Sequence, residues 1–398
     1  MNIILFDTKQ RINLLPLTFT RPMGELRVGI LTAAERWKHL TKAPISYKTQ
    51  PYLSTLFPMQ LSADNYFING GVVADTELAK EIIALSIGEA LYSNGSLIAA
   101  RLTQTDGEGF DANTFAPANK REFYGALEIK ATHDVFMLND KALRSDFKLL
   151  TEGRKSKAIS DTNRVIAPEN IFIEESATVE CANLNASTGP IYIGPDAEVM
   201  EGSSIRGPFA LCDHSQLKLN TKIYGPTTVG PHSKVGGEVT RSVIMGYSNK
   251  GHDGFLGDSV LGYWCNLGAD TNNSNLKNNY AEVKLWDYES KRFKKTGLQF
   301  CGLIMGDHSK CGINTMFNTG TVVGICANIF GAGFPRNFIP DFAWGGAQGF
   351  ETYLPAKVFE TAELVYQRRG KTLTDDEKAM LTEVFNQTKE DRFWENAK

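Results

Sequence analysis

The sequence has no apolar run approaching the roughly 20 residues that a membrane span requires. It also has no excess of positive charge, because 42 Lys and Arg residues are set against 45 Asp and Glu residues. With a net charge of −3, we expect neither a membrane protein nor a nucleic-acid-binding protein. Residues 1–7 contain no basic leader and no cleavage site, so we do not interpret them as a signal peptide.

Cysteine is scarce, and no two cysteines form a C-x-x-C pair. All six lie after residue 180, in the part of the chain that carries the repeats described next. We therefore expect reduced, buried thiols in a cytosolic protein rather than disulfides or a metal site. The cysteines are Cys181, Cys212, Cys265, Cys301, Cys311 and Cys326.

What the sequence does contain is a period of six residues, because every sixth residue from 193 to 235 is aliphatic. This period matches neither a helix, at about 3.6 residues, nor a plain strand, at about 2. Several of these residues are followed by glycine, which lets the chain bend at a corner. The pattern is typical of a parallel β-helix. The aliphatic positions are Ile193, Val199, Ile205, Leu211, Leu217, Ile223, Val229 and Val235.

The period predicts where the β-helix begins and ends. We expect it to span residues 158–334 and to resume at Phe255 after a shift of register. Residues 272–297 break the pattern and predict a long loop, which on a repeat scaffold usually faces a binding site. Residues 335–398 predict an irregular segment followed by two helices that cap the coil.

Residues 1–150 predict a different fold, because strand patterns alternate with helix patterns. This alternation is typical of an open α/β sheet, which binds ligands at the carboxyl ends of its strands. A polar, basic stretch at 151–157 predicts the boundary with the coil. We expect strands at 2–6, 66–71 and 96–100, and helices at 25–40, 76–85 and 134–150.

His252 is the first candidate for chemistry in the coil. It lies in a glycine-rich segment directly after the register shift at residues 238–250. A histidine side chain is suited to accept a proton from an attacking amine. The alternative is a histidine in a surface turn, since His214, His232 and His308 also occupy positions typical of turns.

Three short motifs surround this histidine at fixed spacing: Gly251-His252, then Leu256-Gly257-Asp258, then Asn266-Leu267-Gly268-Ala269. They resemble the acetyltransferase half of the bifunctional bacterial enzymes that make UDP-N-acetylglucosamine. The resemblance covers nearly the whole chain and is strongest to the variant of this family found in Bacteroidetes. Its other matching stretches are 15–22, 26–29, 272–278, 306–310, 313–315 and 342–346.

The resemblance implies that the chain acetylates glucosamine 1-phosphate with acetyl-CoA and couples the product to UTP, as a homotrimer with a left-handed β-helix. It implies that His252 is the general base and that Asn266 holds the sugar or orients the histidine. Ala269 and Asn275 would lie beside the acetyl group of acetyl-CoA. A backbone amide at Ala269 could then stabilise the oxyanion of the reaction.

The residues implied to bind the sugar phosphate match less closely. Lys277 and Lys284 are both candidates for the family's loop lysine. Lys222 and Arg241 are both candidates for its sugar-binding arginine. Phe255 stands where the family has a tyrosine, which removes one hydrogen bond to the substrate. The amino sugar is therefore left open by the sequence.

The N-terminal half departs from the family in two places. No glycine precedes Gly24, so the phosphate-binding loop is absent, and Gly70-Gly71 replaces the Gly-Asp pair that holds Mg²⁺. Arg21 and Arg27 are candidates for binding phosphate, because a guanidinium matches its oxygens. The domain is then either a divergent nucleotidyltransferase with unknown metal ligands, or a domain that only binds a sugar nucleotide or braces the trimer. Other enzymes open to the chain are a thymidylyltransferase and an N-acyltransferase of another sugar phosphate.

Overall fold

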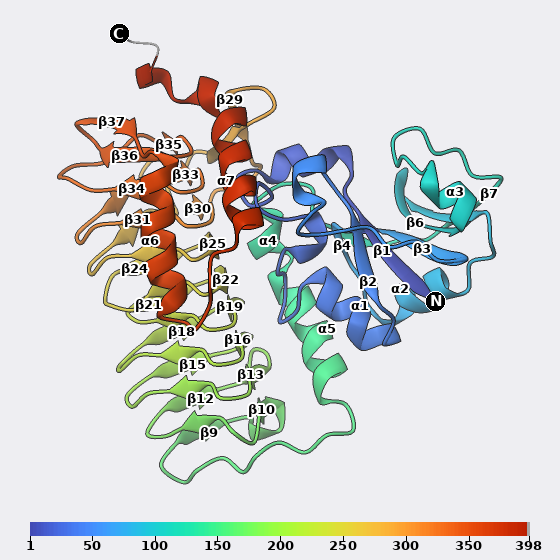
Figure 1. The fold of residues 1–398 in the computed structure, drawn as a ribbon. Coiled ribbons are helices and arrows are strands. Elements are labelled where there is room, and N and C mark those ends of the chain that lie inside the picture. Colours follow the sequence, from blue (N-terminus) through green and yellow to red (C-terminus); the bar gives the residue numbers. More distant parts are fainter. Residues whose placement is uncertain (396–398) are drawn as a thin grey trace.

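This computed structural model describes residues 1–395, and its N-terminal part is the expected α/β domain (Figure 1). One six-stranded sheet has the order β2-β1-β3-β6-β5-β7, in which β2, β1 and β3 run parallel and β6 runs antiparallel to β3. The strands are β1 (Asn2–Phe6), β2 (Ile45–Lys48), β3 (Asp64–Asn69), β5 (Glu89–Ser93), β6 (Ser96–Thr103) and β7 (Asn119–Glu122), with β4 (Val72–Val73) and β8 (Leu127–Glu128) paired apart.

The helices of this domain are shorter than the sequence predicts. The helix expected at 25–40 is wrong at its start, because α1 (Ala33–Thr41) begins only after Thr32. Gly29 has a φ of +84°, which an α-helix does not allow, and the Thr32 side chain then caps the new helix. The other helices are α2 (Thr76–Ile83), α3 (Gln104–Glu108), α4 (Asp134–Met137) and α5 (Asn139–Thr151).

The coil is a parallel β-helix with three faces, as the hexapeptide period predicts (Figure 1). Face 1 contains β10 (Ile171–Ile173), β13 (Ile191–Ile193), β16 (Phe209–Leu211), β19 (Thr227–Val229), β22 (Val243–Gly246), β25 (Val260–Tyr263), β30 (Ile304–Met305), β33 (Val322–Val323) and β35 (Phe338–Ile339). Face 2 contains β11 (Thr178–Val179), β14 (Glu198–Val199), β17 (Gln216–Leu217), β20 (Lys234–Val235), β23 (Asn249–Lys250), β26 (Asn266–Leu267), β31 (Lys310–Cys311), β34 (Asn328–Ile329), β36 (Ala343–Gly346) and β37 (Gly349–Thr352). Face 3 contains β9 (Arg164–Ile166), β12 (Asn183–Asn185), β15 (Ser204–Arg206), β18 (Lys222–Tyr224), β21 (Glu238–Thr240) and β24 (Phe255–Gly257).

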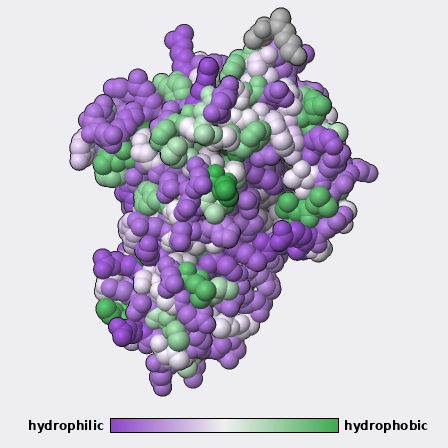
Figure 2. Space-filling view, turned by 90° about the vertical axis from the view of Figure 1, so that its left-hand side faces the viewer, coloured by the Kyte–Doolittle hydropathy of each residue, from purple (hydrophilic) through white to green (hydrophobic). Residues whose placement is uncertain are grey.

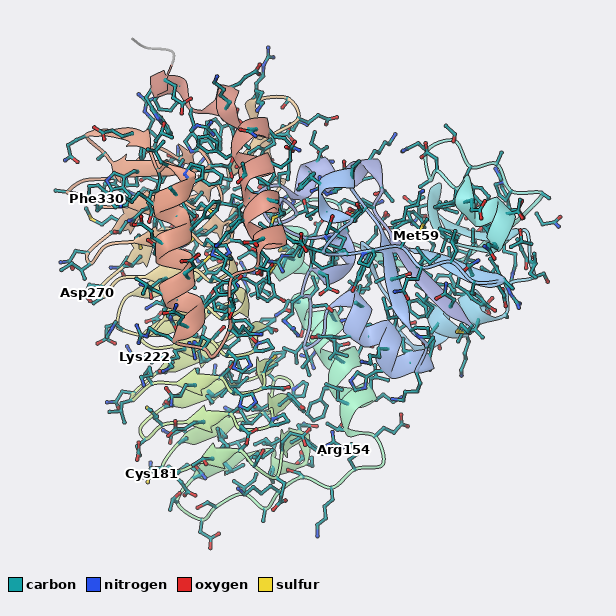
Figure 3. The ribbon with its side chains drawn as sticks, viewed as in Figure 1. Met59, Arg154, Cys181, Lys222, Asp270 and Phe330 are labelled. Carbon is teal, nitrogen blue, oxygen red and sulfur yellow. The ribbon has the colours of Figure 1, made fainter. Side chains whose placement is uncertain are left out.

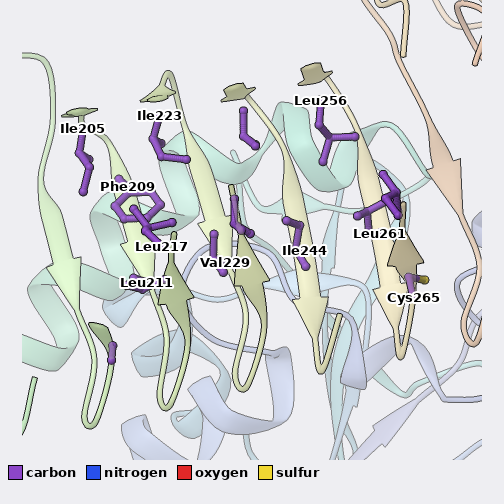
Figure 4. Packing of buried hydrophobic residues seen from close by; sticks show 14 of the residues in the cluster. Ile205, Phe209, Leu211, Leu217, Ile223, Val229, Ile244, Leu256, Leu261 and Cys265 are labelled. Atoms are coloured by element: carbon purple, nitrogen blue, oxygen red, sulfur yellow. The ribbon is translucent and has the colours of Figure 1, made fainter. Parts of the chain in front are cut away.

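The predicted aliphatic column fills the interior of the coil (Figure 4). All eight side chains from Ile193 to Val235 are between 0% and 2% exposed. The inward position expected at Phe255 is wrong, because Leu256 is the inward residue and Phe255 is half-buried on the outside. On face 2, Leu217 pairs with Val235, 18 positions later, whereas Val235 pairs with Lys250, only 15 positions later. Shorter coils therefore shift the period.

The coil also continues beyond the predicted end at residue 334. Val322 in β33 pairs with Phe338 in β35, and Ile329 in β34 pairs with Gly345 in β36. Gly331 has a φ of +98° between these coils, in an irregular turn that hides the period of six. The chain then ends in α6 (Pro355–Gln367) and α7 (Asp375–Gln387). The insertion forms a hairpin of β28 (Lys284–Asp287) and β29 (Arg292–Lys295), between β27 (Asn272–Asn273) and its partner β32 (Met316–Phe317).

The three faces of the coil differ in what covers them. Face 1 is buried across all three residues of β16 and β19, because α5 and the N-terminal domain pack on it. Face 3 is open at β15 and β18, where only the middle residue of each strand is buried, whereas two of the three residues are buried in β21 and in β24. Figure 2, which looks at the side of the coil away from the N-terminal domain, shows a largely hydrophilic surface with small separate apolar patches. No helix within residues 1–395 is long and apolar enough to cross a membrane.

Candidate functional site

His252 lies in the turn between β23 on face 2 and β24 on face 3, and we call the column of such turns the outer corner. Its side chain is exposed and makes no hydrogen bond with any other residue in 1–395. Three residues earlier, Asn249 pairs with Asn266 of the next coil. Ala269 follows in the next turn of the outer corner, where its carbonyl accepts a hydrogen bond from the Asn314 amide at 2.8 Å. The register of adjacent coils thus places His252 next to Ala269 at the outer corner, whereas Asn266 lies on face 2 next to Asn249.

A second cluster lies at the other end of face 3, in the turn between β24 and β25. The Asn275 side chain donates to Asp258 Oδ2 at 2.6 Å, and Arg241 forms an ion pair with the other oxygen. The Arg241 guanidinium also lies 5.6 Å from the centre of the Phe300 ring. Burial raises the pKa of Asp258 above its usual value, although Arg241 and Asn275 both lower it. Asn275 is therefore held at the start of the insertion by a carboxylate that Arg241 neutralises.

Face 3 connects these two clusters. Phe255 in β24 donates its amide to Asn272 Oδ1 at 2.8 Å, and β24 pairs through β21 with β18, which carries Lys222. Lys222 lines a cavity of about 790 Å³ on this face, together with Tyr224 and Glu238. Figure 3 shows Lys222 and Asp270 along the edge of the coil that faces away from the N-terminal domain. Open face 3 therefore carries Lys222, Arg241 and Asn275, with His252 at its edge.

The two lysines of the insertion lie apart from these clusters. Lys277 donates to the Glu282 carbonyl at 3.0 Å and lines a separate cavity of about 560 Å³ with Asn318 and Asn337. Lys284 is exposed in the β28–β29 hairpin, opposite Lys295. Neither lysine contacts a residue of the clusters on face 3, so their role stays a prediction.

Arg21 and Arg27 lie in the interface between the N-terminal domain and the coil. Arg21 forms an ion pair with Asp307 and stacks 3.9 Å from the centre of the Tyr263 ring. Arg27 is 3% exposed, donates Nε–H to the Met245 carbonyl at 3.1 Å and binds both oxygens of Glu35 at 3.0 and 3.1 Å. Arg27 is fully engaged within the protein, whereas Arg21 binds Asp307 through one nitrogen, has no hydrogen-bond partner for Nε within residues 1–395 and lines a cavity of about 270 Å³.

The carboxyl edge of the N-terminal sheet is filled by the chain itself. Asp7, which follows β1, accepts hydrogen bonds from the Met23 amide at 2.7 Å and the Thr49 hydroxyl at 2.6 Å, and burial raises its pKa. A Cβ on Gly70 would lie 2.7 Å from the Gly24 nitrogen, so the two loops touch. Within residues 1–395, no group of three His, Cys, Asp or Glu side chains could hold a metal ion. Mg²⁺ is often held by only one or two carboxylates together with the phosphates of the substrate, so its use by this domain stays a prediction.

Lys250 is a residue that the sequence prediction missed. It occupies an inward position of face 2, opposite Val235, and is 1% exposed. Its ammonium donates to the His252 carbonyl at 2.7 Å and to the Gly236 carbonyl at 3.0 Å. Burial lowers its pKa to about 8, against the opposing effect of Asp253 and Asp270. Lys250 lies 17 positions before Leu267, which is the length of one coil in this part of the chain. The prediction did not identify it as an inward residue because the period of six is interrupted here.

The buried ammonium predicts a pH-dependent stability. Because the folded pKa lies near 8 and the unfolded pKa near 10.5, the native protein releases this proton first as pH rises. The free energy of unfolding should therefore rise by about 3 kcal/mol through this window, relative to Lys250→Met. Urea denaturation of both proteins at pH 7.5 and 10 measures the difference. Parallel pH curves for the two proteins would contradict it.

Comparisons with known proteins find a family model and several relatives. Residues 3–155 match the family model described as sugar nucleotidyl transferase. The chain is 32% identical over 174 residues to the bifunctional sugar-1-phosphate nucleotidylyltransferase/acetyltransferase of Sulfurisphaera tokodaii, across 43% of this chain and 42% of that protein. It is 38% identical over 87 residues to the bifunctional protein GlmU of Methanocaldococcus jannaschii, across 22% and 21%.

These matches confirm the resemblance seen in the sequence, although the chain spans less than half the length of either relative. Among solved structures, the Arabidopsis UDP-N-acetylglucosamine acyltransferase is similar with a TM-score of 0.23 and 14% identity, over 57% of this chain and 90% of that chain. A likeness at this level indicates nothing about function.

Proposed function

We propose that the chain transfers an acetyl group from acetyl-CoA to the amine of glucosamine 1-phosphate, at the outer corner of its coil. In this step the amine nitrogen attacks the thioester carbon, a C–N bond forms and the C–S bond breaks. His252 accepts the proton that the amine loses, and coenzyme A leaves as a thiolate that then takes up a proton. The observation that carries the proposal is the position of His252, which is exposed at the outer corner in the turn next to that of Ala269.

The neighbouring groups supply the remaining roles. Asn266 orients the sugar or the imidazole, and the backbone at Ala269 stabilises the oxyanion. Asn275, which Asp258 holds at the other end of face 3, is the candidate for a contact with the acetyl group. The sugar phosphate binds to Arg241 and Lys222 on face 3, with Lys277 or Lys284 from the insertion as the further candidates.

The exposed His252 supports a site that is completed by a second copy of the chain. One chain leaves the imidazole exposed and face 3 open, whereas a proton-transfer site works best where water is excluded. We therefore propose that the active form is the homotrimer, in which a neighbouring coil covers this edge.

For residues 1–150 we propose two alternatives. In the first, the domain transfers a nucleotidyl group from UTP to a sugar 1-phosphate with Mg²⁺. Arg21 and Arg27 then bind phosphate after their ion pairs with Asp307 and Glu35 break. In the second, the domain braces the coil. The contact between Gly24 and Gly70 favours the second, because it fills the edge where a nucleotide would bind.

One assay tests the proposed acetyl transfer: release of free thiol from acetyl-CoA in the presence of glucosamine 1-phosphate. We expect turnover with this substrate and none with glucose 1-phosphate, which lacks the amine. Turnover of another amino sugar 1-phosphate alone would keep the reaction and change the substrate. Absence of turnover with every amino sugar would contradict the proposal.

A second assay separates the alternatives for the N-terminal domain. Release of pyrophosphate from UTP or dTTP with N-acetylglucosamine 1-phosphate and Mg²⁺ identifies a nucleotidyltransferase. If Arg21→Met and Arg27→Met each lose this release while the stability of the coil is unchanged, both arginines bind the nucleotide. If neither UTP nor dTTP releases pyrophosphate with the sugar phosphate, the result supports the bracing role.

A further inference from the structure

Lys250 places an ammonium group inside the coil. It occupies the inward column of face 2, in which its neighbours are the apolar side chains Leu217, Val235 and Leu267. A buried ammonium destabilises the folded state unless its protons are hydrogen-bonded. The hydrogen bonds of Lys250 therefore indicate what the residue does.

The contacts of Lys250 lie at the outer corner. Its Nζ donates to the carbonyl of His252, in the turn that follows, and to the carbonyl of Gly236, in the turn of the preceding coil. The ammonium thereby ties two successive turns of the outer corner together. The ionisable groups that face it from neighbouring elements are Asp253 and Asp270 in these turns and the Cys311 thiol on face 2.

The bond from Lys250 is the one hydrogen bond that His252 makes within the described chain. Packing fixes the far end of this turn, because a Cβ on Gly254 would lie 2.2 Å from the Thr271 carbonyl oxygen. The backbone of the turn also lies against the preceding coil, because a Cβ on Gly237 would lie 3.0 Å from the His252 carbonyl oxygen. These contacts limit the space of the turn, and the hydrogen bond from Lys250 is the directional contact that fixes the His252 carbonyl.

We propose that Lys250 is a positioning residue, which holds the His252 backbone from inside the coil and so directs its imidazole toward the substrate. The inference rests on the proposed function of His252 as general base. A displacement of about 1 Å at a catalytic group can lower a rate by about 100-fold, so the loss of this tie should appear in kcat.

The test compares Lys250→Met with Leu217→Met in the full-length chain. Methionine fills the space of the lysine stem and removes all donors, and Leu217→Met changes the same inward column without touching the outer corner. We expect Lys250→Met to lower kcat about 10- to 100-fold, with the KM for acetyl-CoA within about twofold of wild type. Lys250→Gln, which keeps an N–H donor, should lose less than Lys250→Met. Leu217→Met should keep wild-type kcat.

Hydrogen–deuterium exchange gives a readout that does not depend on turnover. We expect faster exchange in Lys250→Met confined to peptides that cover residues 248–258, while the rest of the coil exchanges as in wild type. Wild-type kcat in Lys250→Met, or an equal loss in Leu217→Met, would overturn the positioning role. If wild type transfers no acetyl group, the proposed function fails, and unchanged exchange at 248–258 would then overturn the inference independently.

Discussion

Replacing His252 by alanine is expected to lower kcat for acetyl transfer by about 100- to 10,000-fold, because a positioned general base contributes a factor of this size. The KM for acetyl-CoA should change little, since the imidazole accepts a proton and is not proposed to bind the cofactor. Thiol release measured over a range of acetyl-CoA concentrations for both proteins checks both expectations.

His214→Ala is the matched control for this experiment. His214 also lies in a turn of the coil, and its side chain is 52% exposed. Its Nδ1 atom lies 3.6 Å from Asp196 Oδ2. It stacks on His232 at a different corner, between faces 1 and 2, and so lies outside the proposed site. We expect His214→Ala to keep the wild-type rate. Equal rates for wild type and His252→Ala would remove His252 as the base.

The sequence predicts the coil well because the period of six residues can be seen within a short stretch of the chain. One aliphatic side chain in every sixth position must point inward, so Ile193 to Val235 can be assigned without knowing the rest of the fold. The assignment fails where the number of residues in a coil changes, as at Leu256. A change in the length of a coil, as between Val235 and Lys250, leaves no mark on composition but moves the inward positions that follow.

The candidate site was predicted only in part, for a different reason. His252, Asn266 and Ala269 are recognised by their spacing in the sequence, and the structure places His252 next to Ala269 while Asn266 lies on face 2. Arg21 binds Asp307 and Arg27 binds the Met245 carbonyl, both from the coil. The sequence does not show such contacts, so it could not tell a phosphate-binding arginine from one inside a domain interface. Lys250 illustrates the opposite error, because a lysine is expected outside a core unless its contacts are known.

The interface that occupies Arg27 depends on a second buried pair, Arg36 and Asp146. Asp146 on α5 is 0% exposed, accepts hydrogen bonds from Arg36 at 2.8 and 2.7 Å, and also accepts the amides of Ile30 and Leu31 at 2.8 and 3.1 Å. Asp146→Ala would leave a guanidinium and two amides buried without their partner. We expect it to lower the free energy of unfolding by about 3–5 kcal/mol.

Asp140→Ala is the control for Asp146→Ala, because Asp140 lies on the same helix and pairs with Arg144 at 2.8 Å in an exposed position. This exposed pair should contribute less than about 1 kcal/mol. Urea denaturation gives both values, and faster amide exchange at residues 29–31 in Asp146→Ala would locate the loss. Where both variants are folded, acetyl transfer at the outer corner should keep its wild-type kcat, because Asp146 lies against the opposite face of the coil. A similar loss of stability in both variants would mean that burial of Asp146 does not control this interface.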